Sequence, residues 1–226
     1  MVRSLKLLGV AVALLIPSVA SAQPYGPPPP GQPMYVNVNP WQFHQGLTFE
    51  ANIGVGFMWA RETFSDGTAS TSDTKAGLGG VNLGLGGWVS PNLAISARVA
   101  SVTYTISQDI GGGNQFSESL VGAFIGPSIQ YWLDPHLWIG GGAGIAYAAV
   151  LSHDDINGVT VNEANQTGFG LDLRAGYSFS SGVSPNSWNV SVEFNPGFFA
   201  GQDDGNGNTS TIQLNGFAIL FGYQYL

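Results

Sequence analysis

The stretch LTFEANIGVGFMWA, residues 47–60, alternates between two kinds of residue. Its odd positions are apolar, from Leu47 and Phe49 to Trp59, whereas its even positions are mostly polar or small, such as Glu50 and Asn52. Because the side chains of a β-strand alternate between the two faces of a sheet, this pattern predicts a strand with one apolar face.

The same period of two recurs along the rest of the chain. Together with the first stretch it gives eight predicted strands, and most exceed the roughly 9–11 residues that a tilted strand needs to cross a bilayer. Within residues 93–107 the apolar parity changes near Val102, which predicts a β-bulge there. The other seven stretches are residues 76–89, 93–107, 116–133, 137–150, 167–179, 188–199 and 210–226.

The connections between these stretches alternate in length. Alternating short periplasmic turns and long outer loops are typical of outer-membrane barrels, in which aromatic residues gather near both ends of the strands. The sequence therefore predicts an all-β domain at residues 47–226, an eight-stranded antiparallel up-and-down transmembrane β-barrel. The longer connections are 61–75, 108–115, 151–166 and 200–209, and the shorter ones are 90–92, 134–136 and 180–187.

The composition supports this interpretation over a soluble protein. Only 9% of the residues are charged, against about 25% in soluble domains. In a soluble β-sandwich or lipocalin-like barrel the apolar residues would face inward, and the residues that alternate with them would face water. Those alternating residues are mostly Gly, Ala, Asn and Ser, which predicts poor solubility. The absence of cysteine excludes disulfides and cysteine zinc sites, and the net charge of -8 argues against nucleic acid as a partner.

Two segments precede the predicted barrel. Residues 1–22 have the basic, apolar and Ala20-Ser21-Ala22 regions of a signal peptide, which predicts cleavage after Ala22 and export to the cell outer membrane. Residues 23–46 contain Pro27 to Pro30, which favour an extended periplasmic linker. A docking motif for a periplasmic partner is the alternative interpretation of the linker.

The chain resembles the eight-stranded outer-membrane β-barrel superfamily that includes the OmpA transmembrane domain, OmpX and Opa-like proteins. The resemblance covers residues 47–226 and rests on strand count, loop alternation, the turns VSPNLAI (89–95) and WLDPHLWIG (132–140), and the aromatic last strand. It implies a monomer of a Gram-negative cell envelope that contacts outer-membrane lipid and lipopolysaccharide and is inserted by the barrel insertion machinery.

Some of the residues that alternate with the apolar ones are charged. We expect these charged residues inside the barrel, because an unpaired charge facing lipid is costly. Pairing Phe179 with Trp188 places Arg174 directly opposite Glu193. This predicted lumen charge layer is either a structural plug or a gate for an ion path. Its members are Glu50, Arg98, Asp172, Arg174 and Glu193.

Small and large residues also fall on the inward parity. The glycines leave either room for bulky neighbours such as Phe124 or a small-ligand cavity. Trp88, Trp132 and Trp138 lie beside the predicted periplasmic turns, where they would cap the lumen if the strands reach that far. The inward glycines are Gly80, Gly84, Gly86, Gly122, Gly126, Gly140, Gly142 and Gly144.

The sequence favours a structural or surface-interaction role through acidic outer loops, with an unknown extracellular partner. The alternative is a narrow porin-like channel or small-ligand carrier. A lipid-modifying enzyme is less favoured, because neighbours in Ser152-His153-Asp154 do not form a triad by spacing. DDGNGN at 203–208 hints at calcium but fails the EF-hand pattern. We therefore predict no catalytic residues, no cofactor and no metal site.

Overall fold

The computed structural model describes residues 41, 43–65, 67–71, 74–111, 114–154, 159–179, 185–203 and 209–226. At positions 78–79, 107–111, 114–116, 152–154, 159–164 and 202–203 it describes the backbone alone. The predicted signal peptide at 1–22 and the linker up to residue 40 lie outside the described residues. None of the described residues forms a helix long and apolar enough to cross a bilayer.

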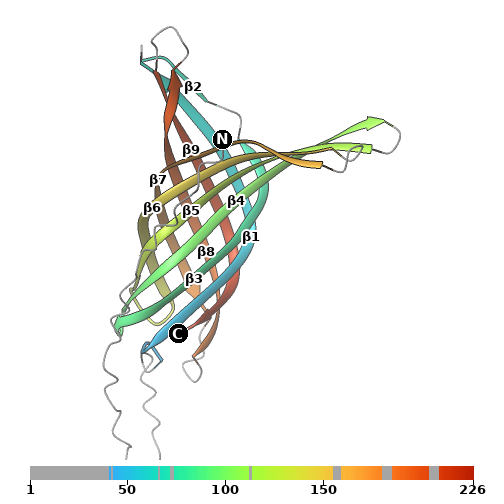
Figure 1. Ribbon diagram of the computed structural model, residues 1–226. Helices are drawn as coiled ribbons and strands as arrows, with labels where there is room; N and C mark the ends of the chain where they lie inside the picture. Colours follow the sequence, from blue (N-terminus) through green and yellow to red (C-terminus); the bar gives the residue numbers. More distant parts are fainter. Residues whose placement is uncertain are drawn as a thin grey trace, which may run out of the picture. The chain divides into compact units, whose positions relative to one another are not determined.

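The described chain forms a closed barrel (Figure 1). Consecutive strands pair antiparallel, and β1 also pairs with β9, so that eight strands form a ring and the short β2 adds to the outer edge of β1. This confirms the predicted eight-stranded up-and-down architecture. The strands are β1 (Leu47–Phe64), β2 (Ala69–Thr71), β3 (Lys75–Ser90), β4 (Leu93–Gly111), β5 (Asn114–Trp132), β6 (Leu137–Asp154), β7 (Val159–Ser178), β8 (Asn186–Asp203) and β9 (Thr209–Tyr225).

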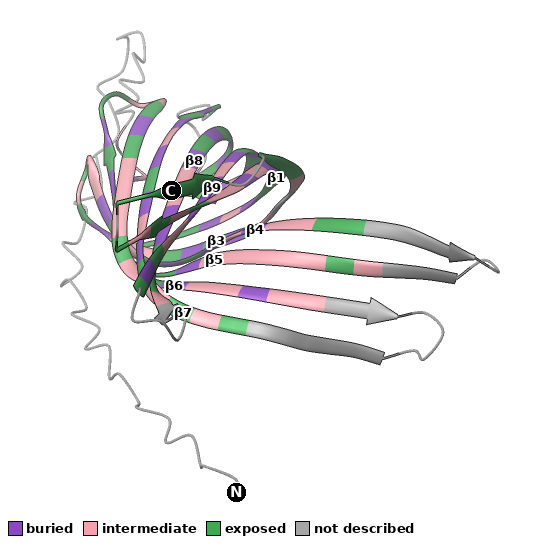
Figure 2. Ribbon diagram, turned by 90° about the horizontal axis from the view of Figure 1, so that it is seen from above, coloured by how far each residue is buried: buried purple, intermediate pink, exposed green. Residues whose placement is uncertain are grey.

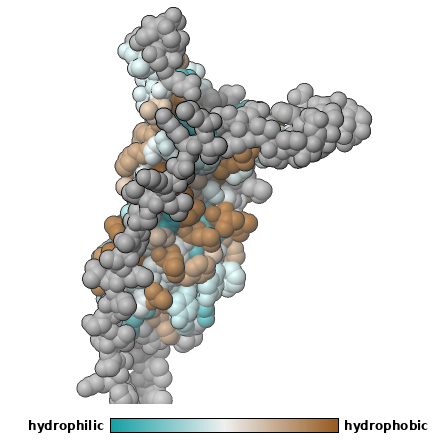
Figure 3. Space-filling model, in the orientation of Figure 1, coloured by the Kyte–Doolittle hydropathy of each residue, from teal (hydrophilic) through white to brown (hydrophobic). Residues whose placement is uncertain are grey.

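The apolar residues of the alternating pattern lie on the outer face of the barrel and the residues that alternate with them lie on the inner face, as the sequence predicts. Buried and exposed residues alternate along the barrel strands in Figure 2, and apolar side chains gather over the middle of the barrel surface in Figure 3. Leu47 and Ile53 are 68% and 62% exposed, while Thr48, Glu50 and Asn52 on the same strand are buried. The inner face is therefore largely polar and the outer face apolar, the reverse of a soluble barrel.

The bulge predicted in β4 is wrong. β4 and β5 pair without a shift from Leu93↔Tyr131 to Asp109↔Gln115, and Val102 is buried inside the barrel. The extra residue lies in β3 instead, because the registers of β3 with both β1 and β4 shift between Gly79 and Asn82–Leu83. Val102 points inward because the lumen has an apolar layer at that height, where Val102 packs in a cluster with Met58 and Leu214.

In two predicted long loops, 108–115 and 151–166, every described residue is strand instead. Residues 108–111 and 151–154 continue β4 and β6, and residues 159–166 belong to β7. Backbone pairs such as His153↔Thr160 and Gln108↔Phe116 hold these extensions together. The sequence pattern missed them because polar strands without an apolar face carry no period-two signal.

At the end of the barrel that carries these extensions, the strands no longer form a closed ring. We call this end the rim. Pairing of β7 with β8 ends at Phe169↔Phe198, and pairing of β3 with β4 ends at Leu78↔Thr103. β4 to β7 continue together as a projecting sheet, away from β1, β2 and β9 (Figures 1 and 2). We call this sheet the arm; it comprises residues 104–111, 114–120, 150–154 and 159–168.

Candidate functional site

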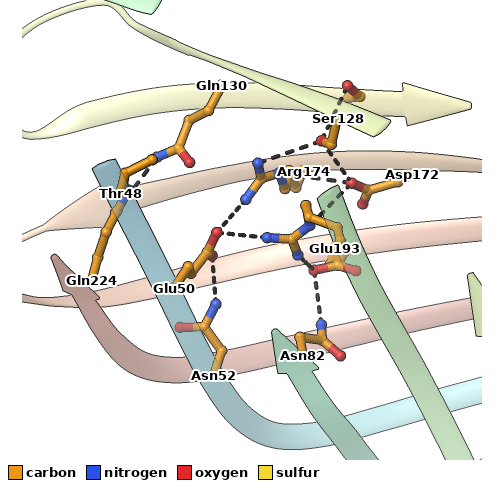
Figure 4. A network of polar contacts seen from close by, with 12 residues as sticks. Thr48, Glu50, Asn52, Asn82, Ser128, Gln130, Asp172, Arg174, Glu193 and Gln224 are labelled. Carbon is orange, nitrogen blue, oxygen red and sulfur yellow. Dashed lines mark hydrogen bonds and ion pairs between the residues drawn. The ribbon is translucent and has the colours of Figure 1, made fainter. Parts of the chain in front are cut away.

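The five charged residues predicted to line the lumen lie together in the structure (Figure 4). Arg98 of β4 contacts three carboxylates, with its nitrogen atoms 2.6 Å from Glu50, 2.8 Å from Glu193 and 3.3 Å from Asp172. Arg174 of β7 lies 2.6 Å from Glu50 and 3.8 Å from Asp172. The five side chains come from four strands, so that their ion pairs cross the lumen and join opposite walls.

The register predicted between β7 and β8 is present, but the charges pair differently. Arg174 lies opposite Glu193 in the ladder. The ion pairs of Arg174 nevertheless go to Glu50 and Asp172, and Glu193 contacts Arg98. In a narrow closed barrel the wall opposite is within reach of an arginine, so the partner across the lumen competes with the partner on the next strand.

Polar uncharged residues complete this layer. Asn52 and Asn82 donate hydrogen bonds to Glu50 and Glu193. Ser128 donates to Asp172, and Arg174 donates to Ser128. Sequence reasoning placed Asn52 on the polar face of its strand but assigned none of these residues to the charge layer, although all of them face inward. Because three carboxylates face two guanidinium groups, the surrounding amide and hydroxyl donors supply part of the stabilisation of the negative charge.

The lumen is closed toward the short turns by a second layer. Trp88, Trp132 and Trp138 form a buried cluster with Ala94 and Leu226, which shows that the strands reach far enough for their indoles to face inward. Trp138 also touches the charge layer, because the Arg174 guanidinium lies 5.2 Å from the centre of its ring. We call this cluster the aromatic cap.

The aromatic cap also includes the end of the predicted linker. Trp41 and Phe43 pack against the cluster, and His44 is 2% exposed. Sequence reasoning placed residues 41–46 in a spacer because they show no strand alternation. The signal was the aromatic run WQFH directly before β1, since adjacent aromatic residues next to a barrel end have apolar surface to bury.

An apolar layer occupies the lumen on the rim side of the charge layer. Its cluster contains Met58, Val102, Phe199, Leu214 and Leu220. The cavity within this layer measures about 20 Å³, which is room for about one water molecule. Bulky residues such as Phe124 fill the space left by the glycines, so the described side chains offer no room here for the small ligand considered from the sequence.

The residues considered for catalysis and calcium binding are only partly described. Ser152, His153 and Asp154 lie on β6 in the arm, where the structure describes the backbone alone. Residues 204–208 of DDGNGN lie outside the described residues. No group of three or more acidic or histidine side chains is placed to hold a metal ion within the described part of the chain.

Fold and site together define a closed antiparallel β-barrel whose described lumen is filled by aromatic, charged and apolar layers. No protein-family model matches the sequence, and no curated protein matches it. The similar solved structures include several proteins named as outer membrane proteins.

Three of these structures illustrate the likeness. Ail, the attachment invasion locus protein of Yersinia pestis in complex with the heparin analogue sucrose octasulfate, has 11% identity and a TM-score of 0.45 over 80% of this chain and 99% of its own. The outer membrane protein AlkL in DMPC bilayers has 16% identity and a TM-score of 0.43, covering 91% of this chain and 96% of its own. The outer membrane protease OmpT of Escherichia coli has 11% identity and a TM-score of 0.38, covering 80% and 97%.

Proposed function

We propose that this protein is a monomeric outer-membrane barrel that binds an extracellular partner through its arm. Residues 1–22 direct export and are then removed. The exposed apolar face, with side chains such as Leu85, Ile125 and Phe221 each at least half exposed, contacts membrane lipid, while lipopolysaccharide surrounds the rim. An apolar belt of this extent around a closed barrel is the surface that a bilayer covers.

The single observation that carries the interaction role is the free strand edge of the arm. β7 pairs with β6 as far as Val159, but its pairing with β8 ends at Phe169. Residues 159–167 therefore present an edge with no neighbouring strand within the described part of the chain. An unpaired edge is a template to which an extended peptide adds as a further strand.

The charge of the arm supports a basic peptide as the guest. No lysine or arginine occurs between Arg98 and Arg174. The arm strands carry Asp109, Glu118, Asp154 and Glu163, so their formal charge is negative throughout. We infer that the partner presents an extended segment rich in Lys or Arg, whose backbone pairs with β7 and whose charges complement the arm.

Peptide binding to the reconstituted protein tests this proposal. A fluorescent peptide of alternating Lys and Thr should bind the protein in vesicles, and binding should weaken with added salt. Glu163→Gln and Glu118→Gln should each weaken binding roughly 1.5- to 5-fold, as expected for exposed charge pairs. The matched control is Glu62→Gln on β1, which removes the same charge outside the arm.

Two further probes separate strand pairing from charge alone. A peptide with N-methyl groups at alternate residues keeps its charges but loses half of its backbone donors, and it should not bind. Equal binding of the methylated peptide, or of an alternating Glu and Thr peptide, contradicts the proposal. Conductance in planar bilayers is expected to be absent, because three layers fill the lumen; steady single-channel currents would favour the channel interpretation instead.

A further inference from the structure

The segment before β1 lies across the turn end of the barrel. Trp41 and Phe43 pack on the aromatic cap, and the carbonyl oxygen of Gly46 accepts a hydrogen bond from the backbone nitrogen of Trp88 at 2.9 Å. Gly46 adopts a positive φ of 74°, which a residue without a Cβ adopts most easily. This conformation turns the chain from the cap into β1. We call Trp41 and residues 43–46 the strap.

His44 is the centre of the strap. Its imidazole stacks on the Trp88 indole, with ring centres 4.1 Å apart and planes inclined by 15°, and it meets Trp132 edge-on at 4.6 Å. Trp41 covers it at 5.0 Å. Its Nδ1 lies 2.6 Å from the carbonyl oxygen of Pro91 in the β3–β4 turn. One side chain therefore joins the strap to two strands and a turn.

The surroundings of Nε2 favour a neutral His44 ring. The Pro91 carbonyl can only accept, so Nδ1 carries a proton in both the neutral and the protonated ring, and the two forms differ only at Nε2. Nε2 is buried and has no hydrogen-bond partner within the described part of the chain. Protonation would create a buried N–H donor and a positive charge there with no acceptor, which is unfavourable.

The described contacts of the His44 ring are with uncharged groups, three indole rings and the Pro91 carbonyl. One charged group lies at the edge of the aromatic cap, the Arg174 guanidinium on Trp138. Arg174 is already paired with Glu50 and Asp172.

We propose that the strap is an acid-released closure of the turn end of the lumen, with His44 as the residue that senses pH. In neutral solution the strap seals the aromatic cap. In acid the protonated ring leaves the cap, and the strap detaches while the barrel stays folded. This inference is independent of the partner proposed for the arm.

The direction of the pH dependence follows from burial. Desolvation lowers the pKa of His44 below its ordinary value of 6.5, and the bond to the Pro91 carbonyl only partly opposes this. A lowered pKa in the closed state means that the released state binds the proton more tightly. Closure is therefore fully favoured above pH 6.5 and is lost as the pH falls through the pKa of the closed state.

A nitroxide label on the strap tests the proposal in the full chain. The protein has no cysteine, so Gln45→Cys provides a single attachment site at an exposed strap residue. The label should be immobilised at neutral pH and become mobile on acidification, with a midpoint below 6.5. His44→Gln, which can still donate to Pro91 but cannot gain a charge, should keep the label immobile at every pH. His136→Gln is the matched control and should behave like the parent.

The outcomes distinguish closure from general unfolding. Far-ultraviolet circular dichroism of the same samples should remain that of the folded barrel throughout the titration. A parent label whose mobility does not change with pH overturns the proposal, and so does one that becomes more immobile in acid, as a cation–π cage would produce. The parent titration needs no substitution at His44, so it decides the question even if His44→Gln fails to fold.

Discussion

Arg98 and Arg61 are the same residue type in two regions of one molecule, the barrel body and the rim. Arg98 is 1% exposed and bridges three carboxylates across the lumen. Arg61 is exposed on the rim extension of β1, opposite Thr71 of β2. In the body every strand is paired on both sides and the lumen is filled, whereas at the rim the sheet divides and leaves strand edges open.

The body and the rim therefore serve different ends, since the body stabilises the fold and the rim is free to bind a partner. In the body a charge has no access to water, so its partners must be supplied by the protein and their removal is costly. At the rim water replaces any lost partner, so charges and edges are free to serve binding. Substitutions in the two regions should therefore differ in their effect on the free energy of unfolding.

Replacing Arg98 should destabilise the barrel most. Arg98→Leu removes the cation shared by Glu50, Asp172 and Glu193, and breaking such a buried network costs about 3–5 kcal/mol. The measurement is the free energy of unfolding by urea in lipid vesicles. Arg61→Leu is the matched control, and its effect should stay within about 0.5 kcal/mol. Equal losses in the two variants would contradict the proposed division between body and rim.

Adding a methyl group between the charge layer and the aromatic cap should destabilise the barrel, but less than replacing Arg98 does. A Cβ at Gly176 would overlap the indole of Trp138, which is fully buried. Gly176→Ala should therefore cost about 1–3 kcal/mol, as overpacking does, in the same unfolding assay. At Gly84 a Cβ would meet Arg98 at an ordinary contact distance of 3.4 Å. Gly84→Ala is thus the control, and a loss for Gly176→Ala no larger than that for Gly84→Ala would show that the turn end is packed loosely enough to accept the methyl group.

The smallest effect on stability is expected for Asp134, in the exposed turn between β5 and β6. Asp134 accepts hydrogen bonds of 2.7 Å from the backbone nitrogens of His136 and Leu137, and these bonds lower the pKa of Asp134 below 3.8. A lowered pKa contributes stability above 3.8 that is lost as the pH falls through the pKa of the folded state. Asp134→Asn should therefore be slightly less stable than the parent at neutral pH.

Thermal unfolding followed by circular dichroism measures this difference. It should disappear in strong acid, because the parent carboxyl is then protonated. A difference of equal size at both pH values would mean that the charge of Asp134 plays no part in ordering the turn.

The sequence predicted the barrel body well for a physical reason. An apolar outer surface on one side and a narrow lumen on the other impose a period of two, so that the alternation alone places Glu50, Arg98 and Glu193 inside. The register of β7 and β8 followed from a single aromatic pair, Phe179 and Trp188. Which charges pair was not predictable, because the choice depends on distances across the lumen rather than along a ladder.

The rim and the turn end were harder to predict. Residues 108–111, 114–115, 151–154 and 159–166 of the arm show no sustained apolar alternation, and the sequence predicts loops there, whereas the rest of the arm lies within predicted strands. Val102 suggested a bulge because an apolar residue on the inner parity is unexpected in a polar lumen, yet the lumen contains an apolar layer. His44 was assigned to a spacer, because only its neighbours in space, Trp88 and Trp132, make it part of the cap.

The sequence by itself determined which face of each strand meets apolar surroundings, because alternation is a local property of the chain. It thereby determined the class of fold and explained how a chain with 9% charged residues and 33 glycines is built. Only the tertiary structure decided the network around Arg98, the closure of the cap by the strap and the division of the sheet at the rim. Each of these depends on contacts between residues far apart in the chain, and the closed ring of strands is what brings those residues together.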